Sequence, residues 1–157
     1  MRRVLVTGMS GTGKSAALDE LANRGFRTVD TDLPGWSEWI AEGDGRGEWL
    51  WCEDRIAELL ATEDDRTLYI SGCVPNQGRF YDRFDAIVLL SARADVILER
   101  IERRTTNNYG KSDSERALIL EDLTEVEPRL RATCTHELDA SQPLATVVEQ
   151  LIKIGNE

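Results

Sequence analysis

Short apolar runs alternate with segments of helical periodicity along most of the chain. Runs with β-prone composition, bounded by polar or turn residues, are predicted as strands. They are Val4–Thr7, Arg27–Asp30, Thr67–Ser71, Ala86–Ser91 and Thr135–Asp139. Segments in which apolar residues recur every three or four positions are predicted as helices. They are Lys14–Asn23, Gly47–Ala61, Ala94–Arg104, Glu115–Ala132 and Gln142–Ile154. Strands that alternate with helices favour an α/β fold, with a parallel sheet covered by helices on both faces.

Turn and breaker residues refine this pattern. Pro128 predicts a bend or break inside the helical segment Glu115–Ala132, because proline removes a hydrogen-bond donor and crowds the preceding turn. Pro143 lies near the first turn of the last helix, where a missing N–H does no harm. The loop composition of Thr105–Ser114 and the "EGDGRGE" run at 42–48 predict a loop and a surface turn. No repeat or linker interrupts the chain, so we expect one domain over residues 1–157.

Composition narrows the class of partner. The formal net charge of −10 disfavours non-specific binding to nucleic acid or to an acidic membrane. With one histidine and no C-x-x-C pair among three cysteines, a zinc site has little to build on, and reduced thiols are expected. No apolar run reaches the length of a membrane span. We therefore expect a cytoplasmic protein, monomeric or homodimeric, that acts on a small molecule.

The segment "GMSGTGKS", Gly8 to Ser15, fits the phosphate-loop pattern G-x-x-x-x-G-K-[ST] (Walker A) between a predicted strand and a predicted helix. Glycines let the backbone wrap closely around a phosphate, and the N–H groups point inward at the positive end of the helix dipole. Lys14 would neutralise the β and γ phosphates, and Ser15 would bind magnesium through its hydroxyl. The residues expected to bind the nucleotide here are Gly8, Ser10, Gly11, Thr12, Gly13, Lys14, Ser15 and Ala16.

The second predicted strand ends in "DTD". This places Asp30 and Asp32 at the carboxyl end of a parallel strand, which is the end of the sheet where ligands bind. Asp30 is a candidate magnesium ligand, and Asp32 is a candidate to accept a proton from a substrate hydroxyl. Otherwise one of them only caps a turn or the next helix. Downstream, Arg100 and Arg104 share a helix face. They could stabilise a migrating phosphoryl group, or they could form ordinary ion pairs with neighbouring glutamates.

Taken together, these motifs make the chain similar to the small P-loop kinases related to nucleoside monophosphate kinases and shikimate kinase. The resemblance runs from "VLVTGMSGTGKS" through "DTD" and "ERIERR" to "DASQPLATVVEQL". It implies a three-layer fold whose five-stranded parallel sheet has the order 2-3-1-4-5, an acceptor-binding region at about 32–62 and a lid at about 104–115. It also implies catalytic roles for Lys14, Asp32, Arg100 and Arg104.

The resemblance further assigns roles at the two ends of the site. "RIERR" looks like adenylate kinase, which implies that Arg100 lies against the adenine and that Arg104 reaches the phosphates. The turn before the last helix, with Ser141, Gln142 and Pro143, would then bind the base. "DTD" is instead similar to shikimate and gluconate kinases, in which the first aspartate serves magnesium and the second holds the hydroxyl that is phosphorylated.

The acceptor region departs from shikimate kinases. Only Arg55, displaced in sequence, offers an arginine there, "SGCVPNQG" stands where those kinases have a triple-glycine turn, and Val126 takes the place of a substrate arginine. The residues expected to bind the acceptor are Asp32, Trp36, Arg55, Gly72, Asn76, Gln77 and Arg116. Asn76 and Gln77 could instead cap a short helix.

All four tryptophans fall between Trp36 and Trp51. On a helical turn, Trp36 and Trp39 would share a face, whereas Trp49 and Trp51 would diverge. The four rings therefore cannot line one pocket wall, and Trp36 is the one predicted to touch the acceptor because it closely follows Asp32.

These observations predict an ATP- and Mg²⁺-dependent kinase (transferase) of a small molecule. A nucleotide or nucleoside-like acceptor is favoured by the aromatic and amide content. A hydroxylated acid or sugar acid is the alternative. A nucleotide-binding regulatory ATPase without a small-molecule acceptor is the rival from another class, although the sequence contains no N-K-x-D guanine motif.

Overall fold

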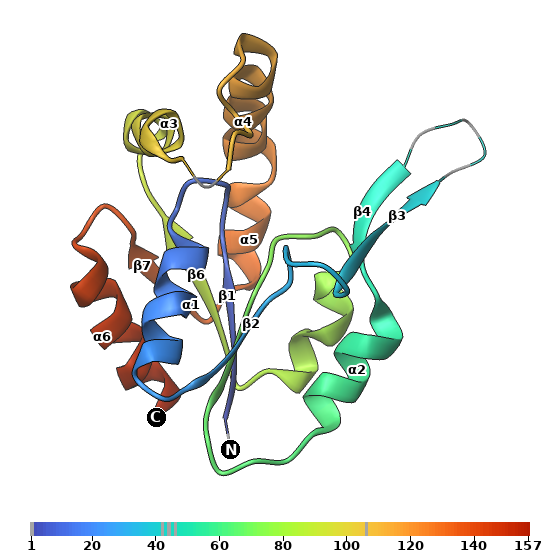
Figure 1. Cartoon of the computed structure of the whole chain (residues 1–157), viewed down its shortest axis with the longest axis vertical. Helices are drawn as coiled ribbons and strands as arrows, with labels where there is room; N and C mark the ends of the chain where they lie inside the picture. The colour runs from blue at the N-terminus through green and yellow to red at the C-terminus, as the bar shows by residue number, and fades with distance from the viewer. Residues whose placement is uncertain (1, 42, 44, 46, 106) are drawn as a thin grey trace.

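A five-stranded parallel sheet forms the centre of the protein in the computed structural model, which describes residues 2–41, 43, 45, 47–105 and 107–157. Its strands are β1 (Arg3–Thr7), β2 (Arg27–Asp30), β5 (Leu68–Ser71), β6 (Ala86–Ser91) and β7 (His136–Asp139). They lie in the order β2-β5-β1-β6-β7, and every neighbouring pair is parallel (Figure 1). Numbered along the chain within this sheet, that order is 2-3-1-4-5, which confirms the predicted fold.

Helices cover both faces of the sheet because side chains alternate along each buried strand. Val4 and Val6 of β1 pack against helices α1 (Lys14–Asn23) and α6 (Leu144–Gly155) on one face. Leu5 points to the opposite face, toward α2 (Glu53–Ala61) and the short 3₁₀ helix η1 (Gln77–Arg83). With this packing the carboxyl ends of all five strands meet at one edge, where the phosphate loop follows β1 (Figure 1).

Helices α3 (Ala94–Arg103), α4 (Asp113–Glu125) and α5 (Glu127–Thr133) follow β6. In Figure 1, α3 and α4 stand beyond the carboxyl ends of the strands. The Ser112 hydroxyl caps α4 by accepting a hydrogen bond from Glu115 N at 3.2 Å. The helix is interrupted at Val126, between α4 and α5, and Pro128 lies in the first turn of α5. The predicted break in this helical segment is therefore confirmed.

One predicted element is wrong. The segment Gly47–Ala61 is not a single helix, because its first part forms strand β4 (Gly47–Trp51). This strand pairs in antiparallel register with β3 (Ser37–Ala41), with Trp39 opposite Trp49 and Ser37 opposite Trp51. Only the remainder of the segment is helical, as α2. The turn predicted at 42–48 falls partly on residues 42, 44 and 46, which lie outside the described residues.

The hairpin changes the environment of the tryptophans. The expectation that Trp36 and Trp39 share a helix face is wrong, because Trp36 immediately precedes β3 and Trp39 lies within it. The Trp51 side chain is 1% exposed and Trp39 is 70% exposed. The Trp39 and Trp49 rings pack at a centroid distance of 5.8 Å. Most of the cluster is therefore a packing unit.

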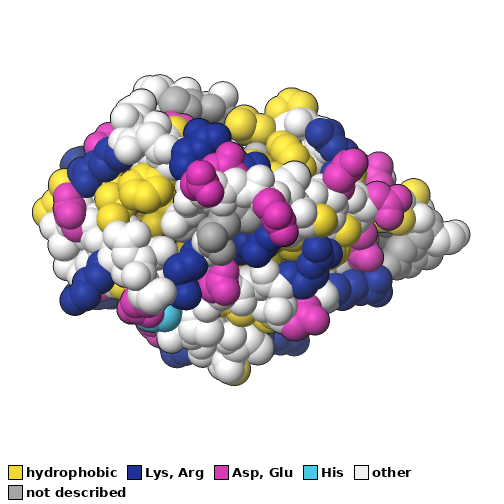
Figure 2. Space-filling view, turned by 90° about the horizontal axis from the view of Figure 1, so that it is seen from below, with side chains coloured by type: hydrophobic (Ala, Val, Ile, Leu, Met, Phe, Trp, Pro, Cys, Tyr) yellow, Lys and Arg dark blue, Asp and Glu magenta, His cyan; other side chains and the backbone are white. Residues whose placement is uncertain are grey.

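The end of the molecule opposite the phosphate loop carries acidic and basic side chains interspersed with apolar ones (Figure 2). Among the described residues, no helix combines the length and apolar character that crossing a membrane requires.

Candidate nucleotide and acceptor site

The phosphate loop runs from the end of β1 into α1. Gly8 and Gly13 have φ angles of 148° and 89°, which residues other than glycine rarely adopt. A Cβ at Gly8 would also lie 2.4 Å from the backbone oxygen of Leu90. The buried Thr12 hydroxyl holds the turn by donating to Met9 O at 2.8 Å. Glycine is thus required by the shape of the loop itself, which supports the predicted phosphate cradle.

Lys14 lies at the start of α1 and folds back over the loop. Its ammonium donates to Gly8 O at 2.6 Å and to Met9 O at 3.1 Å. Burial lowers the pKa of Lys14, and the nearby Cys73 and Asp32 partly offset this effect. A lysine in this environment has given up hydration without gaining a full counter-charge, so it is ready to meet an anion.

Ser15 and Asp30 come together from α1 and β2. The Ser15 hydroxyl donates to Asp30 Oδ2 at 2.7 Å, and Asp30 Oδ1 accepts a hydrogen bond from Asp32 N at 3.0 Å. A hydroxyl beside a carboxylate is an oxygen donor set that fits Mg²⁺. No group of three or more His, Cys, Asp or Glu side chains able to hold a metal exists among the described residues. A magnesium ion at Ser15 and Asp30 would therefore need phosphate or water oxygens as well.

Asp32 lies in the turn after β2 and lines the same pocket as Lys14. Loss of hydration raises the pKa of its carboxyl, Lys14 opposes the rise, and Asp30 adds to it. A carboxylate with a raised pKa accepts a proton more readily than an ordinary one, which suits a group that holds or deprotonates a hydroxyl.

A cavity of about 430 Å³, the phosphate pocket, surrounds these groups. The side chains and backbone that line it come from the phosphate loop, the turn after β2, the segment after β5, α3 with the residues that follow it, and α4. They are Gly8, Met9, Ser10, Gly11, Gly13, Lys14, Ser15, Ala16, Asp32, Cys73, Arg100, Arg104, Asn107 and Asp122. All four residues predicted to be catalytic line this pocket. Their catalytic roles remain predictions.

A smaller cavity of about 250 Å³, the base pocket, adjoins it. The two share Gly13, Ala16 and Arg100. The base pocket is completed by Thr12, Ala140, Gln142, Leu144 and Val147. Two of the predicted base-binding residues, Arg100 and Gln142, thus line it.

The turn before α6 is held in place by Asp139. Its Oδ1 accepts hydrogen bonds from Ser141 N at 2.9 Å and from Ser141 Oγ at 2.5 Å. These bonds lower the pKa of the Asp139 carboxyl. Ser141 therefore shapes the turn, and Pro143 precedes α6 as its N-terminal flanking residue.

Arg104 reaches the phosphate loop from the end of α3. Its guanidinium donates to Asn107 O at 3.1 Å and to Tyr109 O at 2.6 Å, which folds the lid, and it contacts Ser10 Oγ at 3.4 Å. Burial lowers the pKa of Arg104. An ion pair on α3 joins the preceding residue, Arg103, to Glu99 at 2.8 Å. Arg104 thus joins the lid to the phosphate loop.

Asn76 and Gln77 lie inside the protein, and their amides are used there. Asn76 Oδ1 accepts from Trp51 N at 3.0 Å, and its amide nitrogen donates to Trp51 O at 3.1 Å and to Glu53 Oε2 at 3.0 Å. The side-chain oxygen of Gln77 accepts a hydrogen bond from Val74 N at 3.0 Å, and its side-chain nitrogen donates to Thr7 Oγ1 at 3.1 Å. Both side-chain amides therefore position loops around the pocket. The contact of Asn76 and Gln77 with the acceptor stays a prediction, and these internal hydrogen bonds do not favour it.

Gly72 provides space for packing. A Cβ there would lie 2.4 Å from Thr31 Oγ1 and 3.1 Å from Trp51 Nε1. Those two atoms are hydrogen-bonded to each other at 2.9 Å, and Thr31 Oγ1 also donates to Ser71 O at 2.7 Å. Thr31, which sequence reasoning passed over, thus anchors the "DTD" segment. Its position between the two aspartates was the available signal.

Trp36 is half-buried and packs against the core cluster that contains Trp51 and Ile56. The Arg55 guanidinium stacks on its ring at 4.6 Å from the centroid and donates to the backbone oxygen of Gly35. Arg116 lies on α4 and is not among the described residues that line either cavity. The predicted acceptor contacts of Trp36, Arg55 and Arg116 remain predictions.

Outside the phosphate loop, three residues that line the phosphate pocket were not predicted as site residues: Cys73, Asn107 and Asp122. Cys73 follows β5 and, like Leu123 of α4, packs against the buried cluster of Met9, Leu89 and Leu130. This packing holds the end of α4, and with it Asp122, against the pocket. Sequence spacing gave no signal for this contact because Asp122 reads as one more exposed helical acid.

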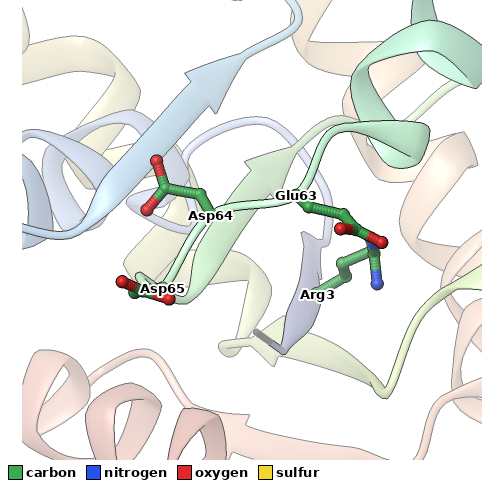
Figure 3. A pocket seen from close by; sticks show the side chains of 4 residues that line it. All are labelled: Arg3, Glu63, Asp64 and Asp65. Atoms are coloured by element: carbon green, nitrogen blue, oxygen red, sulfur yellow. The ribbon is translucent and has the colours of Figure 1, made fainter.

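A third hollow, of about 680 Å³, lies elsewhere. Arg3, Glu63, Asp64 and Asp65 line it (Figure 3). It sits near the amino ends of β1 and β5, at the other end of the strands from the phosphate loop. We therefore assign it no part in the site.

Curated proteins similar to this chain carry two kinds of description. A nucleotide-binding protein of Paraburkholderia xenovorans strain LB400 is 29% identical over 167 residues, which cover 98% of this chain and 53% of that protein. Shikimate kinase 2 of Yersinia enterocolitica is 28% identical over 163 residues, which cover 96% of this chain and 94% of that enzyme. The chain thus spans about half the length of the nucleotide-binding relatives it matches.

Solved structures with the same architecture include a shikimate kinase from Bacteroides thetaiotaomicron, with a TM-score of 0.68, 17% identity and 99% coverage of both chains. A shikimate kinase from Acinetobacter baumannii in complex with shikimate has a TM-score of 0.66 and 18% identity, and covers 98% of this chain and 92% of that one. A gluconokinase from Sinorhizobium meliloti 1021 has a TM-score of 0.62 and 21% identity, with 99% and 91% coverage.

At these identities the structural likenesses show the fold, that of small P-loop kinases. The family is shown by the sequence itself. The model described as "AAA domain" matches residues 4–121, which is more than half of the chain. The chain also has the phosphate loop and the strand order described above. Because this family model matches more than half of it, the chain belongs to the AAA domain family of P-loop proteins.

Proposed function

We propose that this chain is an ATP- and Mg²⁺-dependent kinase that phosphorylates a hydroxyl group of a small molecule. The observation that carries the proposal is the single cavity that combines the phosphate loop, Lys14, Arg104 and Asp32. Phosphoryl transfer needs positive groups around the migrating phosphoryl group and a carboxylate beside the attacking hydroxyl. One cavity that holds both supports a kinase better than a simple nucleotide binder.

The nucleotide is proposed to span the two adjoining cavities. Its base would occupy the base pocket, between Arg100 and the turn at Gln142, and its phosphates would replace the loop carbonyls as partners of Lys14. Ser15 and Asp30 would hold magnesium, which neutralises phosphate charge when it is bound. The lid, residues about 104–115, is proposed to exclude water, and residues about 32–62 to form the acceptor region.

The acceptor is proposed to be a small hydroxylated compound rather than a nucleotide. Two of the compared structures are shikimate kinases and one is a gluconokinase. The amides that favoured a nucleobase, Asn76 and Gln77, are engaged in internal hydrogen bonds. The comparisons therefore support the alternative acceptor class better than the nucleotide class first favoured.

A cytoplasmic location, where ATP is available, belongs to the same proposal. The three cysteines, Cys52, Cys73 and Cys134, are free thiols.

The test is formation of ADP from ATP and Mg²⁺ with pooled hydroxylated metabolites. The Lys14→Ala variant, purified in the same way, controls for contaminating kinases. We expect one pool to raise ADP release well above the acceptor-free rate in the wild type alone. Acceptor-independent hydrolysis, unchanged by every pool, would instead support the rival regulatory ATPase.

A further inference from the structure

The sheet order places the nucleotide and the acceptor on opposite sides of β1. The base pocket is built by α6 and by the turn after β7, at one end of the sheet. Asp32 and Cys73 follow β2 and β5, at the other end. If the base occupies its pocket, the terminal phosphate points toward β5 and β2 across the phosphate loop. The part of the phosphate pocket lined by Asp32, Cys73 and Asp122, the acceptor side, is where the hydroxyl must enter.

The acceptor side is acidic. Asp32 and Asp122 contribute carboxylates, and Cys73 contributes a thiol whose pKa is raised by burial. Burial and the neighbouring Glu125 raise the pKa of Asp122. The Asp122 carboxylate forms no ion pair or side-chain hydrogen bond with any residue that the structure describes. It is therefore a carboxylate that lines a ligand cavity and lacks a described partner.

The positive groups of the phosphate pocket are directed elsewhere. Among the described residues that line it, Lys14 donates to the loop carbonyls, and Arg104 donates to the lid carbonyls and contacts Ser10. The third cation, Arg100, also lines the base pocket.

Two arginines outside this pocket, Arg55 and Arg131, are also engaged. Arg55 is held by Trp36 and Gly35, and Arg131 is held by Glu127 and Glu137 at 2.8 Å each. Among the described residues that line the pocket, a carboxylate on the acceptor side would thus meet Asp32 and Asp122 and no cation left for it, and like charges close together repel.

We propose that the acceptor of this chain is an amino alcohol, such as an amino sugar, rather than a hydroxy acid. Its hydroxyl would lie at Asp32, and its ammonium group would lie at Asp122. This inference rests on the proposed kinase function and names the chemical class of its substrate. The transfer itself conserves atoms in the ordinary way: the acceptor oxygen bonds to the γ-phosphorus, the bond to the β-γ bridging oxygen breaks, ADP leaves, and Asp32 accepts the hydroxyl proton.

The experiment compares three acceptor pools of similar molecular size with ATP and Mg²⁺, and measures ADP. One pool holds amino alcohols and amino sugars, one holds neutral sugars and sugar alcohols, and one holds hydroxy acids including shikimate and gluconate. We expect the amino alcohol pool to be the most active. For its best member, Asp122→Asn is expected to lower kcat/KM at least about tenfold, mainly through KM, because the lost charge pair acts on binding.

Glu121→Gln is the matched control, since it removes the same charge from the adjacent position of α4, which is not among the residues that line the pocket, and should leave kcat/KM unchanged. A role of Asp122 in folding alone would lower the activity toward all acceptors by the same factor, and that result would overturn the inference. So would highest activity with hydroxy acids or with neutral sugars, although the kinase function would then stand. ADP release from none of the pools would contradict the kinase function itself.

Discussion

Replacing Thr31 by valine removes the hydroxyl that ties the "DTD" segment to the core. This hydroxyl is fully buried, donates to Ser71 O at 2.7 Å and accepts from Trp51 Nε1 at 2.9 Å. Valine has nearly the same shape, so the change tests the hydrogen bonds and not the packing. Ser71 O keeps its bond from Thr31 N at 3.1 Å, whereas the indole N–H loses its acceptor.

The magnitude follows from these partners. Each hydrogen bond lost costs about 1 kcal/mol, and a buried donor left unpaired costs about 1–3 kcal/mol. The free energy of unfolding is therefore expected to fall by about 2–4 kcal/mol. With a urea dependence of about 2 kcal/mol per molar, the unfolding midpoint should drop by about 1–2 M. Because Thr31 lies between Asp30 and Asp32, turnover should also fall several-fold.

The assay is urea unfolding followed by tryptophan fluorescence and circular dichroism. Thr28→Val, the same substitution on β2, is the control and should change stability little. A double-mutant cycle with Trp51→Phe isolates the pair, and we expect a favourable coupling of about 1 kcal/mol or more. A loss below about 1 kcal/mol in Thr31→Val, or strict additivity with Trp51→Phe, would refute the assigned role of this hydrogen bond.

Three further predictions concern single side chains. Lys14→Ala is expected to lower turnover by about 100-fold or more while the circular dichroism spectrum stays unchanged, because charge stabilisation of the transition state is lost; turnover within a few-fold of wild type would exclude this role. Burial raises the pKa of Asp32 above its ordinary 3.8, so the native state binds a proton at higher pH than the unfolded chain does, and stability falls as pH rises between the two values. Asp32→Asn should therefore be more stable than the wild type in urea at neutral pH, although it turns over more slowly with ATP affinity retained; a variant less stable than the wild type would contradict the pKa shift. Trp39→Ser should change stability by less than about 0.5 kcal/mol, since Trp39 is 70% exposed, and a larger loss in the same urea assay would show that the exposed ring packs more tightly than described.

The features predicted from sequence are those encoded locally. The phosphate loop is a contiguous motif, and each of the five sheet strands is a short β-prone run with turn residues beside it. The break near Pro128 follows from the chemistry of one residue. The strand order came from the resemblance, and the structure confirms it.

What the sequence concealed depends on contacts between distant segments. The spacing of Leu50, Ile56 and Leu59 suits a helix, but the pairing of Trp49 with Trp39 converts the first part of that segment into a strand. Asp122 looks like a solvated helical acid until the packing of Cys73 and Leu123 brings it to the pocket. Periodicity describes one segment at a time, and neither contact is visible to it.

The hydrogen bonds from Lys14 to Gly8 O and Met9 O have a consequence for the cost of binding. The loop is already wound around a positive charge before any nucleotide arrives, so its backbone order is established when the protein folds. Binding then exchanges the lysine's partners, two carbonyl oxygens for phosphate oxygens, and does not have to freeze a flexible glycine-rich segment. A receptor prepared in this way loses little conformational entropy when it captures its ligand, and more of the contact energy is retained as affinity.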